Sequence, residues 1–411
     1  MKPEFPASTG APTFYRTYSR RINDNRENYT NVCKRTTNGL AKVGNFTNKE
    51  LDLVYSMMKK QVALPSGRWM WVGGTEWIEK PENYYSAFNC NSTNINDLES
   101  FGLMMALGMM GCGTGGVLEE KYISQLPPVR NRLQVQVVGT PGQHKVQLKE
   151  THIECDVVNG ELQVEITVGD SRQGWVESMM QVLELGFREI STNLNLPIKI
   201  FVDISSVRPD GTPIKGFGGV ANPIKLSRMY ERIADVLNRY VGRTLDAEGV
   251  CLLLDEPALT IVAGNVRRYA GMRQFDSDAP LLKDNLWVQD EEGNWKIDPE
   301  RDALRMSNHS RVYHHKPSRQ EVTEAVRKQY YSGEGAIQWA GEAVARANAD
   351  LLDTETRKKL FLENYKLDRN LAQAFIRHVA SLRGLELTED ELEHRMSRYK
   401  LNPCGSQYFA A

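Results

Sequence analysis

Cys90 and Cys404 are the residues of this sequence whose surroundings best suit chemistry at a thiol. Cys404 follows Pro403, which fixes the backbone angle φ, and precedes Gly405, which frees it, so the thiol would lie on a tight, defined loop. Cys90 stands in the polar stretch 88–93. A buried structural thiol is the commoner role of a lone cysteine, so the residues alone leave both roles open.

Other cysteine and histidine patterns indicate neither a disulfide framework nor a metal site. Six cysteines in 411 residues, without a C-x-x-C pair, are not typical of a small secreted protein. The sequence lacks zinc-ligand spacing, H-E-x-x-H, a Walker A loop and a dinucleotide turn, and the adjacent pair His314-His315 does not favour a metal. Small buried or incidental roles are expected for the remaining cysteines, which are Cys33, Cys112, Cys155 and Cys251.

Three glycine-rich segments could approach a ligand through their backbone. They are residues 111–116, 215–219 and 264–268; the second includes Lys215, and the third includes Arg267 and Arg268. Glycine lets a ligand come close to the main chain, and exposed N–H groups beside a basic residue suit phosphate. Glycine turns are common, so nucleotide binding and an ordinary structural role both remain open here.

Composition places the chain among ordinary globular proteins. Its 411 residues suggest roughly two or three domains, and 41% hydrophobic with 25% charged residues allows a sizeable core. The net charge of −1 gives no support for a nucleic-acid surface. The first 21 residues contain no apolar signal region, and the longest uncharged run, 101–118, is too rich in glycine for a membrane helix. A cytoplasmic protein without a membrane segment is therefore expected.

Hydrophobic periodicity predicts a mixed α/β chain. Helices are expected at 49–61 with Asn48 as the cap, and at 101–110, where a buried helix leads into a glycine loop. Residues 133–137 alternate like a strand, and Asn159-Gly160 between two alternating runs predicts a hairpin.

Further helices and strands are expected in the second half of the chain. Helices are predicted at 175–185 and 225–241, and short buried segments at 252–254 and 259–263, the latter a strand before Gly264. Helices dominate 319–400, where Thr388 opens a capping box. Together these patterns predict a β-rich insert at about 119–209 within an α/β frame.

Eight segments occur in an order that resembles one protein family. They are residues 66–75, 89–94, 111–116, 169–175, 207–209, 215–222, 262–268 and 402–405. The set resembles the adenosylcobalamin-dependent (class II) ribonucleotide reductases. Within that family it is most similar to the monomeric ribonucleoside-triphosphate reductases, particularly those of cyanobacteria and their viruses. The resemblance runs from about Phe14 to Gly405.

The resemblance implies a ten-stranded α/β barrel, built from two antiparallel five-stranded halves with a finger loop through the centre. The chain would supply an N-terminal helical region (1–85), the first half of the barrel (86–118 and 210–400), an insert with the allosteric effector site (119–209) and the start of the finger loop (401–411).

The same resemblance implies roles for individual residues. Cys404 would become the thiyl radical that abstracts the ribose 3′-hydrogen, Asn402 would bond the ribose hydroxyls, and Cys90 would be one of two thiols that reduce the 2′-position and end as a disulfide, its partner lying outside this chain. Substrate contacts are implied for Ser66, Asn89, Cys90, Gly111 and Asn402. Effector contacts are implied for Asp170, Arg172, Lys215, Arg267, Arg268 and Arg273.

Cofactor and partners follow from the resemblance too. Adenosylcobalamin would generate the radical, ribonucleoside triphosphates would be the substrates, dNTPs or ATP the effectors, and thioredoxin or a similar dithiol the reductant. No nucleic acid or membrane partner is expected, and no resident metal site.

The sequence departs from the family pattern at its end. The family has Glu after Asn-Pro-Cys-Gly as a general base, whereas this chain has Ser406, which cannot accept a proton as a carboxylate does. The family continues for about as much barrel again. We therefore expect an N-terminal half that ends within the finger loop, with 406–411 as a foreign tail and a separate C-terminal half as its complement.

Two other functions remain open. The chain could be a non-catalytic nucleotide-binding half or remnant that needs a complementing polypeptide. It could also belong to the class I reductases, against which the 119–209 insert and the segment Trp69-Met70-Trp71 argue.

Overall fold

The computed structural model describes residues 5, 7–22, 24–144, 146–190, 197–212, 223–261, 269–280, 282–401 and 403. The described residues form two compact units, one ending at Asn89 and the other beginning at Cys90. Among the predicted site residues, five lie outside the described residues: Lys215, Arg267, Arg268, Asn402 and Cys404. The same is true of Ser406 and the rest of 406–411.

The first unit is mainly helical. Its elements are α1 (Gly10–Thr17), β1 (Arg21–Ile22), β2 (Asn25–Arg26), α2 (Tyr29–Val43), α3 (Asn48–Lys59), α4 (Gly67–Val72) and the 3₁₀ helix η1 (Pro81–Ala87). Helix α3 begins at a capping box in which Thr47, and not the expected Asn48, is the cap and pairs reciprocally with Glu50. A small core that includes Phe14, Tyr29 and Cys33 joins α1, α2 and α3.

A five-stranded parallel sheet is the centre of the second unit. Its strands are β3 (Cys90–Asn94), β4 (Gly113–Val117), β9 (Ala270–Asp276), β12 (Ser307–Tyr313) and β13 (Ala336–Trp339). They lie in the order β13-β12-β9-β4-β3, and every neighbouring pair is parallel. This sheet agrees with the expected five-stranded first half of an α/β barrel.

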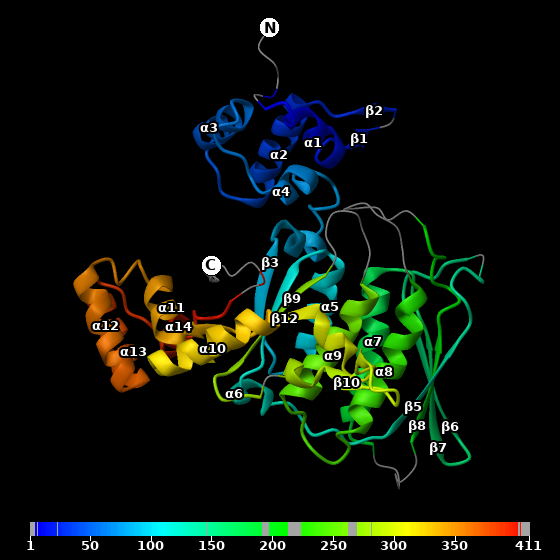
Figure 1. Cartoon of the computed structure of the whole chain (residues 1–411). Coiled ribbons are helices and arrows are strands. Elements are labelled where there is room, and N and C mark those ends of the chain that lie inside the picture. The colour runs from blue at the N-terminus through cyan, green and yellow to red at the C-terminus, as the bar shows by residue number, and fades with distance from the viewer. Residues whose placement is uncertain are drawn as a thin grey trace. The chain divides into compact units, whose positions relative to one another are not determined.

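Four helices separate this sheet from a second one. Helices α5 (Glu99–Met109) and α9 (Ala247–Thr260) pack on the five-stranded sheet, and α7 (Arg172–Phe187) and α8 (Leu226–Asn238) pack on them in turn (Figure 1). One continuous apolar core runs through these layers, because α5 and α9 are buried on nearly all sides.

The second sheet lies within the predicted β-rich insert. Its strands β5 (Leu133–Val138), β6 (His152–Val158), β7 (Glu161–Thr167) and β8 (Ile198–Asp203) lie in the order β5-β8-β7-β6. The hairpin between β6 and β7 is confirmed: the strands pair antiparallel, and both Asn159 (φ 54°) and Gly160 (φ 82°) adopt the left-handed conformation that a tight two-residue turn requires.

The prediction of a strand at 259–263 was wrong as far as the structure describes this segment. Residues 252–254 and 259–260 belong to one helix, α9, which Asp246 caps through the Gly249 N–H and which contains Pro257. A continuous apolar run does not distinguish a buried strand from a buried helix, since both lack a polar face. Helix α9 is of this kind, because its residues from Gly249 to Thr260 are all buried.

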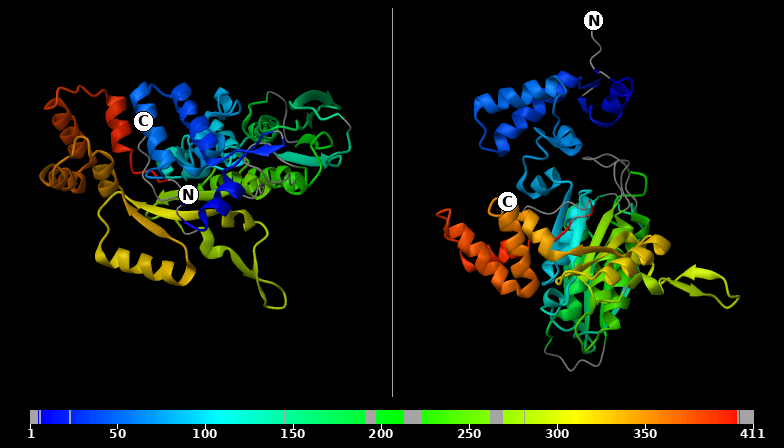
Figure 2. Two further views of the ribbon diagram at one scale, coloured as in Figure 1. Left: turned by 90° about the horizontal axis from the view of Figure 1, so that it is seen from above. Right: turned by 60° about the vertical axis from the view of Figure 1, so that its left-hand side comes forward.

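The remaining short elements lie between the strands and helices already described. Helix α6 (Glu120–Ile123), the 3₁₀ helices η2 (Pro223–Lys225), η3 (Leu282–Asn285) and η4 (Asp302–Met306), and the hairpin of β10 (Trp287–Gln289) and β11 (Trp295–Ile297) connect them. Figure 2 shows the hairpin extending away from the sheet. The C-terminal helices are α10 (Arg319–Ser332), α11 (Ala340–Ala347), α12 (Glu355–Leu367), α13 (Arg369–Ser381) and α14 (Glu389–Met396).

Helices α11 to α14 enclose a core of their own. This group and helices α7 and α8 lie on opposite sides of the five-stranded sheet (Figure 1). The predicted capping box at Thr388 is confirmed, because its side chain and that of Glu391 bond reciprocally. Within the described ranges, every helix is too short or too polar to span a bilayer.

Candidate functional site

The structure brings Cys90 and the glycine-rich segment together at the start of two neighbouring strands. Cys90 opens β3 and lies in register with Gly113, the first residue of the parallel strand β4. Gly111, with φ of 70°, makes the turn between α5 and β4. Cys90 is only 7% exposed, so a thiol here is screened from bulk water, which protects reactive intermediates from side reactions.

Most of the predicted glycine loop at 111–116 is a strand. Residues from Gly113 onward form β4, and every residue of that strand is buried. Close packing explains why residue 116 is a glycine. A Cβ at this position would lie 3.2 Å from Leu118 Cδ1 and 3.3 Å from Arg273 Cδ. Glycine therefore makes room for the Arg273 side chain beside the sheet.

Strand β3 carries a row of polar atoms beside Cys90. Asn91 Nδ2 and Oδ1, Ser92 Oγ and Asn94 Oδ1 are buried and have no hydrogen-bond partner among the described residues. Ser92 and Asn94 share the face of Cys90, since side chains alternate along a strand. Buried polar atoms normally have a partner, so this strand is suited to a polar ligand or a further polypeptide. The polar composition of residues 91–94 is the one signal by which this row could have been predicted.

Ser66 and Asn89, two further predicted substrate residues, lie in the first unit. Ser66 is exposed and caps α4 through the Trp69 N–H (3.2 Å). The Asn89 side-chain oxygen accepts a hydrogen bond from Arg68 Nε (3.0 Å). Both side chains, for which the resemblance implies substrate contacts, thus already have hydrogen-bond partners within the protein.

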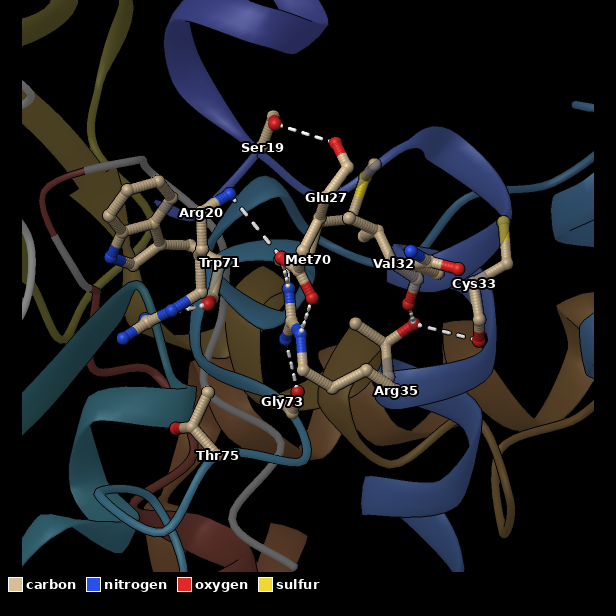
Figure 3. Close-up of polar contacts among 12 residues, drawn as sticks. Ser19, Arg20, Glu27, Val32, Cys33, Arg35, Met70, Trp71, Gly73 and Thr75 are labelled. Carbon is tan, nitrogen blue, oxygen red and sulfur yellow. Dashed lines mark hydrogen bonds and ion pairs between the residues drawn. The ribbon is translucent and has the colours of Figure 1, made fainter. Parts of the chain in front are cut away.

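An ion pair fixes the segment that follows Ser66. Glu27 accepts two hydrogen bonds from Arg35, at 2.7 Å from Nε and 3.0 Å from Nη2, and Arg35 also donates to the carbonyl groups of Met70 and Gly73 (Figure 3). The two carbonyl groups belong to the chain at 66–75, so α2 holds this turn by charge-assisted bonds.

A second arginine supports the same turn. Arg20 donates to the Trp71 carbonyl oxygen (3.1 Å), and its guanidinium lies 5.1 Å from the centre of the Trp71 ring. Burial, and then the charge of Arg35, lower the pKa of Arg20, although an arginine stays protonated.

Arg273, which was expected to contact an effector, is instead a fully buried residue of the core. It lies in β9 with no exposed surface, and its guanidinium pairs with Asp255 of α9 (2.5 Å). It also donates to the Thr114 carbonyl oxygen (3.0 Å) and to the Tyr269 hydroxyl (2.6 Å). Burial acts to lower its pKa, but Asp255 and Tyr269 outweigh this and raise the pKa above its ordinary value. The side chain joins helix to sheet and offers no surface for direct contact with an effector.

The other described effector candidates lie at the start of α7. Asp170 is 7% exposed and accepts hydrogen bonds from the Arg208 backbone N–H (3.1 Å) and from Arg208 Nε (2.8 Å). Ser171 caps the helix through the Gly174 N–H (2.9 Å), and Arg172 is its first residue. Asp170 and Arg172 thus share one helix start, whereas Arg273 belongs to the core of the other sheet.

Cys251, expected to be a small core residue, belongs to a buried polar cluster. Its Sγ lies 3.5 Å from Asp255 Oδ2 and 3.7 Å from His309 Nε2. These three residues form a set that could hold a metal, but Asp255 already binds Arg273 and the Ser307 hydroxyl (2.5 Å). Burial raises the pKa of the Cys251 thiol and lowers that of His309, so both remain neutral. The cluster therefore suits a structural role better than a metal.

Comparison with known protein families finds a match for one segment of the chain. Residues 142–237 match the family described as "B12-dependent ribonucleotide reductase, insertion domain". The match begins before β6, ends in α8, and so lies later than the predicted insert at 119–209.

Curated relatives extend the similarity. The chain is 30% identical over 327 residues to the adenosylcobalamin-dependent ribonucleoside-triphosphate reductase of Lactobacillus helveticus, an alignment of 68% of this chain and 42% of that protein. It is 28% identical over 322 residues to the enzyme of the same name from Lactobacillus acidophilus, with the same coverage. The chain thus spans less than half the length of the curated relatives it matches.

A solved structure has the same fold. The crystal structure of a B12-dependent (class II) ribonucleotide reductase matches with a TM-score of 0.59 and 22% sequence identity, covering 76% of this chain and 47% of the other. At this identity the match speaks for the arrangement of sheets and helices alone.

Proposed function

We infer that this chain belongs to the family of adenosylcobalamin-dependent (class II) ribonucleotide reductases, because an insertion-domain match, curated relatives and a common fold agree. We further propose the narrower kinship, with the monomeric enzymes of cyanobacteria and their viruses, which rests on the eight motifs of the sequence alone.

The function that best fits the geometry is the reduction of ribonucleoside triphosphates to deoxyribonucleoside triphosphates for DNA synthesis. The observation that carries it is the place of Cys90: a buried thiol at the start of β3, in register with Gly113 and in line with polar atoms of Ser92 and Asn94. In this proposal Cys90 is one of the two reducing thiols, and the strand orients the ribose in a water-poor site.

Other roles rest on the family pattern. Cys404 would carry the radical, Asn402 would bond the ribose hydroxyls, and Asn89 and Gly111 would contact substrate; Cys404 and Asn402 lie outside the described residues. The insert would bind dNTP or ATP effectors at the start of α7, near Arg172. Thioredoxin or a similar dithiol would restore the reduced thiols.

Adenosylcobalamin would supply the radical in the complete enzyme. The candidate sites among the described residues do not fit the cofactor: both three-residue sets with metal-binding side chains are held by internal hydrogen bonds, and the hollow beside Lys225 and Arg228 offers only about 260 Å³ even with its open mouth included, too little for a corrin. We therefore assign no described residue to the cofactor and expect its site in the remaining part of the barrel.

The second candidate is a non-catalytic nucleotide-binding half that acts only with a complementing polypeptide. The polar atoms of β3 that have no described partner favour it, since a second half could cover them.

Nucleotide binding by the full chain tests the proposal. We expect isothermal titration to detect dNTP binding, and Arg172→Ala to weaken it, while Arg327→Ala, at an exposed position of α10, leaves it unchanged. Failure of the folded chain to bind any nucleoside triphosphate would contradict both candidates.

A further inference from the structure

A cluster of charged and aromatic side chains gathers at the carboxyl ends of three sheet strands. Glu119 follows β4, Asp276 ends β9 and His314 follows β12, and parallel strands bring these ends to one edge. Their ligand-type atoms lie within 4.8 Å of one another. The cluster includes neither the reducing thiol Cys90 nor the effector candidates at the start of α7.

Glu119 is the centre of the cluster and binds a segment far away in sequence. Its side chain has no exposed surface. One carboxylate oxygen accepts a hydrogen bond from His314 Nε2, and the other accepts one from the hydroxyl of Tyr399, which is 1% exposed. The Tyr399 ring also meets the His314 ring edge to face, with 5.2 Å between the centres.

A second bond fixes the chain two residues later. The Leu401 N–H donates to Gln274 Oε1 (2.8 Å), and Gln274 Nε2 donates to Gln338 Oε1 (3.0 Å). Gln274 is buried in β9, and Gln338 lies in β13. Residues 399–401, here called the loop stem, are therefore tied to β9 and to the ends of β4 and β12.

The charges keep the carboxylate ionised. Burial acts to raise the pKa of Glu119, but the hydrogen bonds from His314 and Tyr399 and the ammonium group of Lys121 outweigh it and lower the pKa. Burial, and then the nearby negative charge of Glu119, raise the pKa of Tyr399, so its hydroxyl remains a donor. A buried ionised carboxylate with two donors makes strong, directed bonds.

The same charges argue against a metal at this place. Lys121 Nζ lies 4.0 Å from Glu119 Oε2, and burial followed by repulsion from Lys121 lowers the pKa of Lys400 to about 8. Asp276 Oδ2 already accepts the Glu120 N–H (2.7 Å). Two ammonium groups at the edge make an added cation unfavourable.

We propose that Glu119 is a positioning residue, which fixes the loop stem and thereby the point from which the chain continues to Asn402 and Cys404. The meaning of that position rests on the proposed function, in which Cys404 carries the radical. The anchor itself rests on the contacts of Glu119, Tyr399 and Leu401. A group that reacts at its tip needs its stem held, because a small displacement costs much rate.

Hydrogen–deuterium exchange of the loop stem in the full chain tests the anchor. Tyr399→Phe removes one hydroxyl and keeps the ring, and Glu119→Ala removes the shared acceptor. We expect each to raise the exchange rate of the Leu401 amide by about tenfold or more, and the double variant to add little beyond the larger single effect. Glu120→Gln, an exposed neighbouring carboxylate, should leave the rate unchanged.

A merely structural role gives a different pattern. The anchor predicts faster exchange at the stem with unchanged protection in β9 and β12. Equal acceleration over the whole sheet, or a Leu401 rate within about twofold of wild type in folded Tyr399→Phe, would overturn it. If Glu119→Ala does not fold, Tyr399→Phe decides alone. Nucleotide titration in parallel tests the proposed function separately, because exchange at the stem needs neither nucleotide nor turnover.

Discussion

Arg273 and Asp255 form an ion pair of 2.5 Å in which neither side chain has any exposed surface. The pair joins β9 to α9, and the Ser307 hydroxyl of β12 bonds the other carboxylate oxygen at 2.5 Å. A buried charge is tolerated only when it is paired, so the two side chains depend on each other.

Replacement of Asp255 tests that dependence. Asp255→Asn leaves the Arg273 guanidinium buried without its counter-charge, and we expect the free energy of unfolding to fall by about 3–5 kcal/mol. Urea denaturation measures it. Asp235→Asn is the matched control, since the Asp235 side chain is 64% exposed and its ion pair with Arg232 spans 3.9 Å, and it should change stability by less than about 0.5 kcal/mol. A loss below about 1 kcal/mol for Asp255→Asn would contradict the interpretation.

Glu27 is predicted to hold the turn at 66–75. Its side chain is 2% exposed and pairs with Arg35, which binds two carbonyl groups of that turn. Glu27→Gln should lower the free energy of unfolding by about 2–3 kcal/mol and make the turn sensitive to protease. Glu79→Gln removes the partner of the exposed Lys42 and should have little effect on either readout. Equal protease sensitivity of the two variants would refute this role.

The lowered pKa of Lys400 predicts that the free energy of unfolding rises in alkaline solution. Its pKa is about 8 in the folded chain and 10.5 ordinarily, so below pH 8 the lysine is charged in both states and its burial costs folding energy. Between these values the folded state releases the proton first, the unfolded state holds more protons, and stability rises with pH.

Comparison of Lys400→Met with wild type isolates this contribution. The variant should be more stable by about 1–2 kcal/mol at pH 7 and should approach the wild-type stability at pH 9.5, as measured by urea denaturation. The exposed Lys366→Met serves as the control and should keep the wild-type pH dependence. An identical pH dependence for Lys400→Met and wild type would show that Lys400 does not titrate in this way.

Local patterns in the sequence predicted elements well where geometry is local. The hairpin at Asn159-Gly160 and the capping box at Thr388 needed only neighbouring residues. Helix α9 was missed because its surroundings are apolar on all sides, and with it the pair of Cys251 and Asp255, one turn apart on that helix.

The candidate site was predictable only in part, because several of its contacts join residues that are far apart in the sequence. Motif order indicated Cys90 and Gly111, which the structure places at neighbouring strand starts. Arg273 was assigned to the effector site through the family resemblance, but it lies in β9 and its counter-charge, Asp255, comes from α9. The bond between Glu119 and Tyr399 joins positions 280 residues apart, and no local pattern reveals such a contact.

Turnover tests the central claim most directly. The 411-residue chain would be combined anaerobically with a polypeptide that carries the remaining half of the barrel, adenosylcobalamin, a dithiol and a radiolabelled ribonucleoside triphosphate. We predict formation of the labelled deoxyribonucleoside triphosphate, abolished by Cys404→Ser and by Cys90→Ser, because each removes a thiol that every turnover needs. Nucleotide binding without any product from the folded, combined polypeptides would contradict the reductase function and leave a nucleotide-binding half.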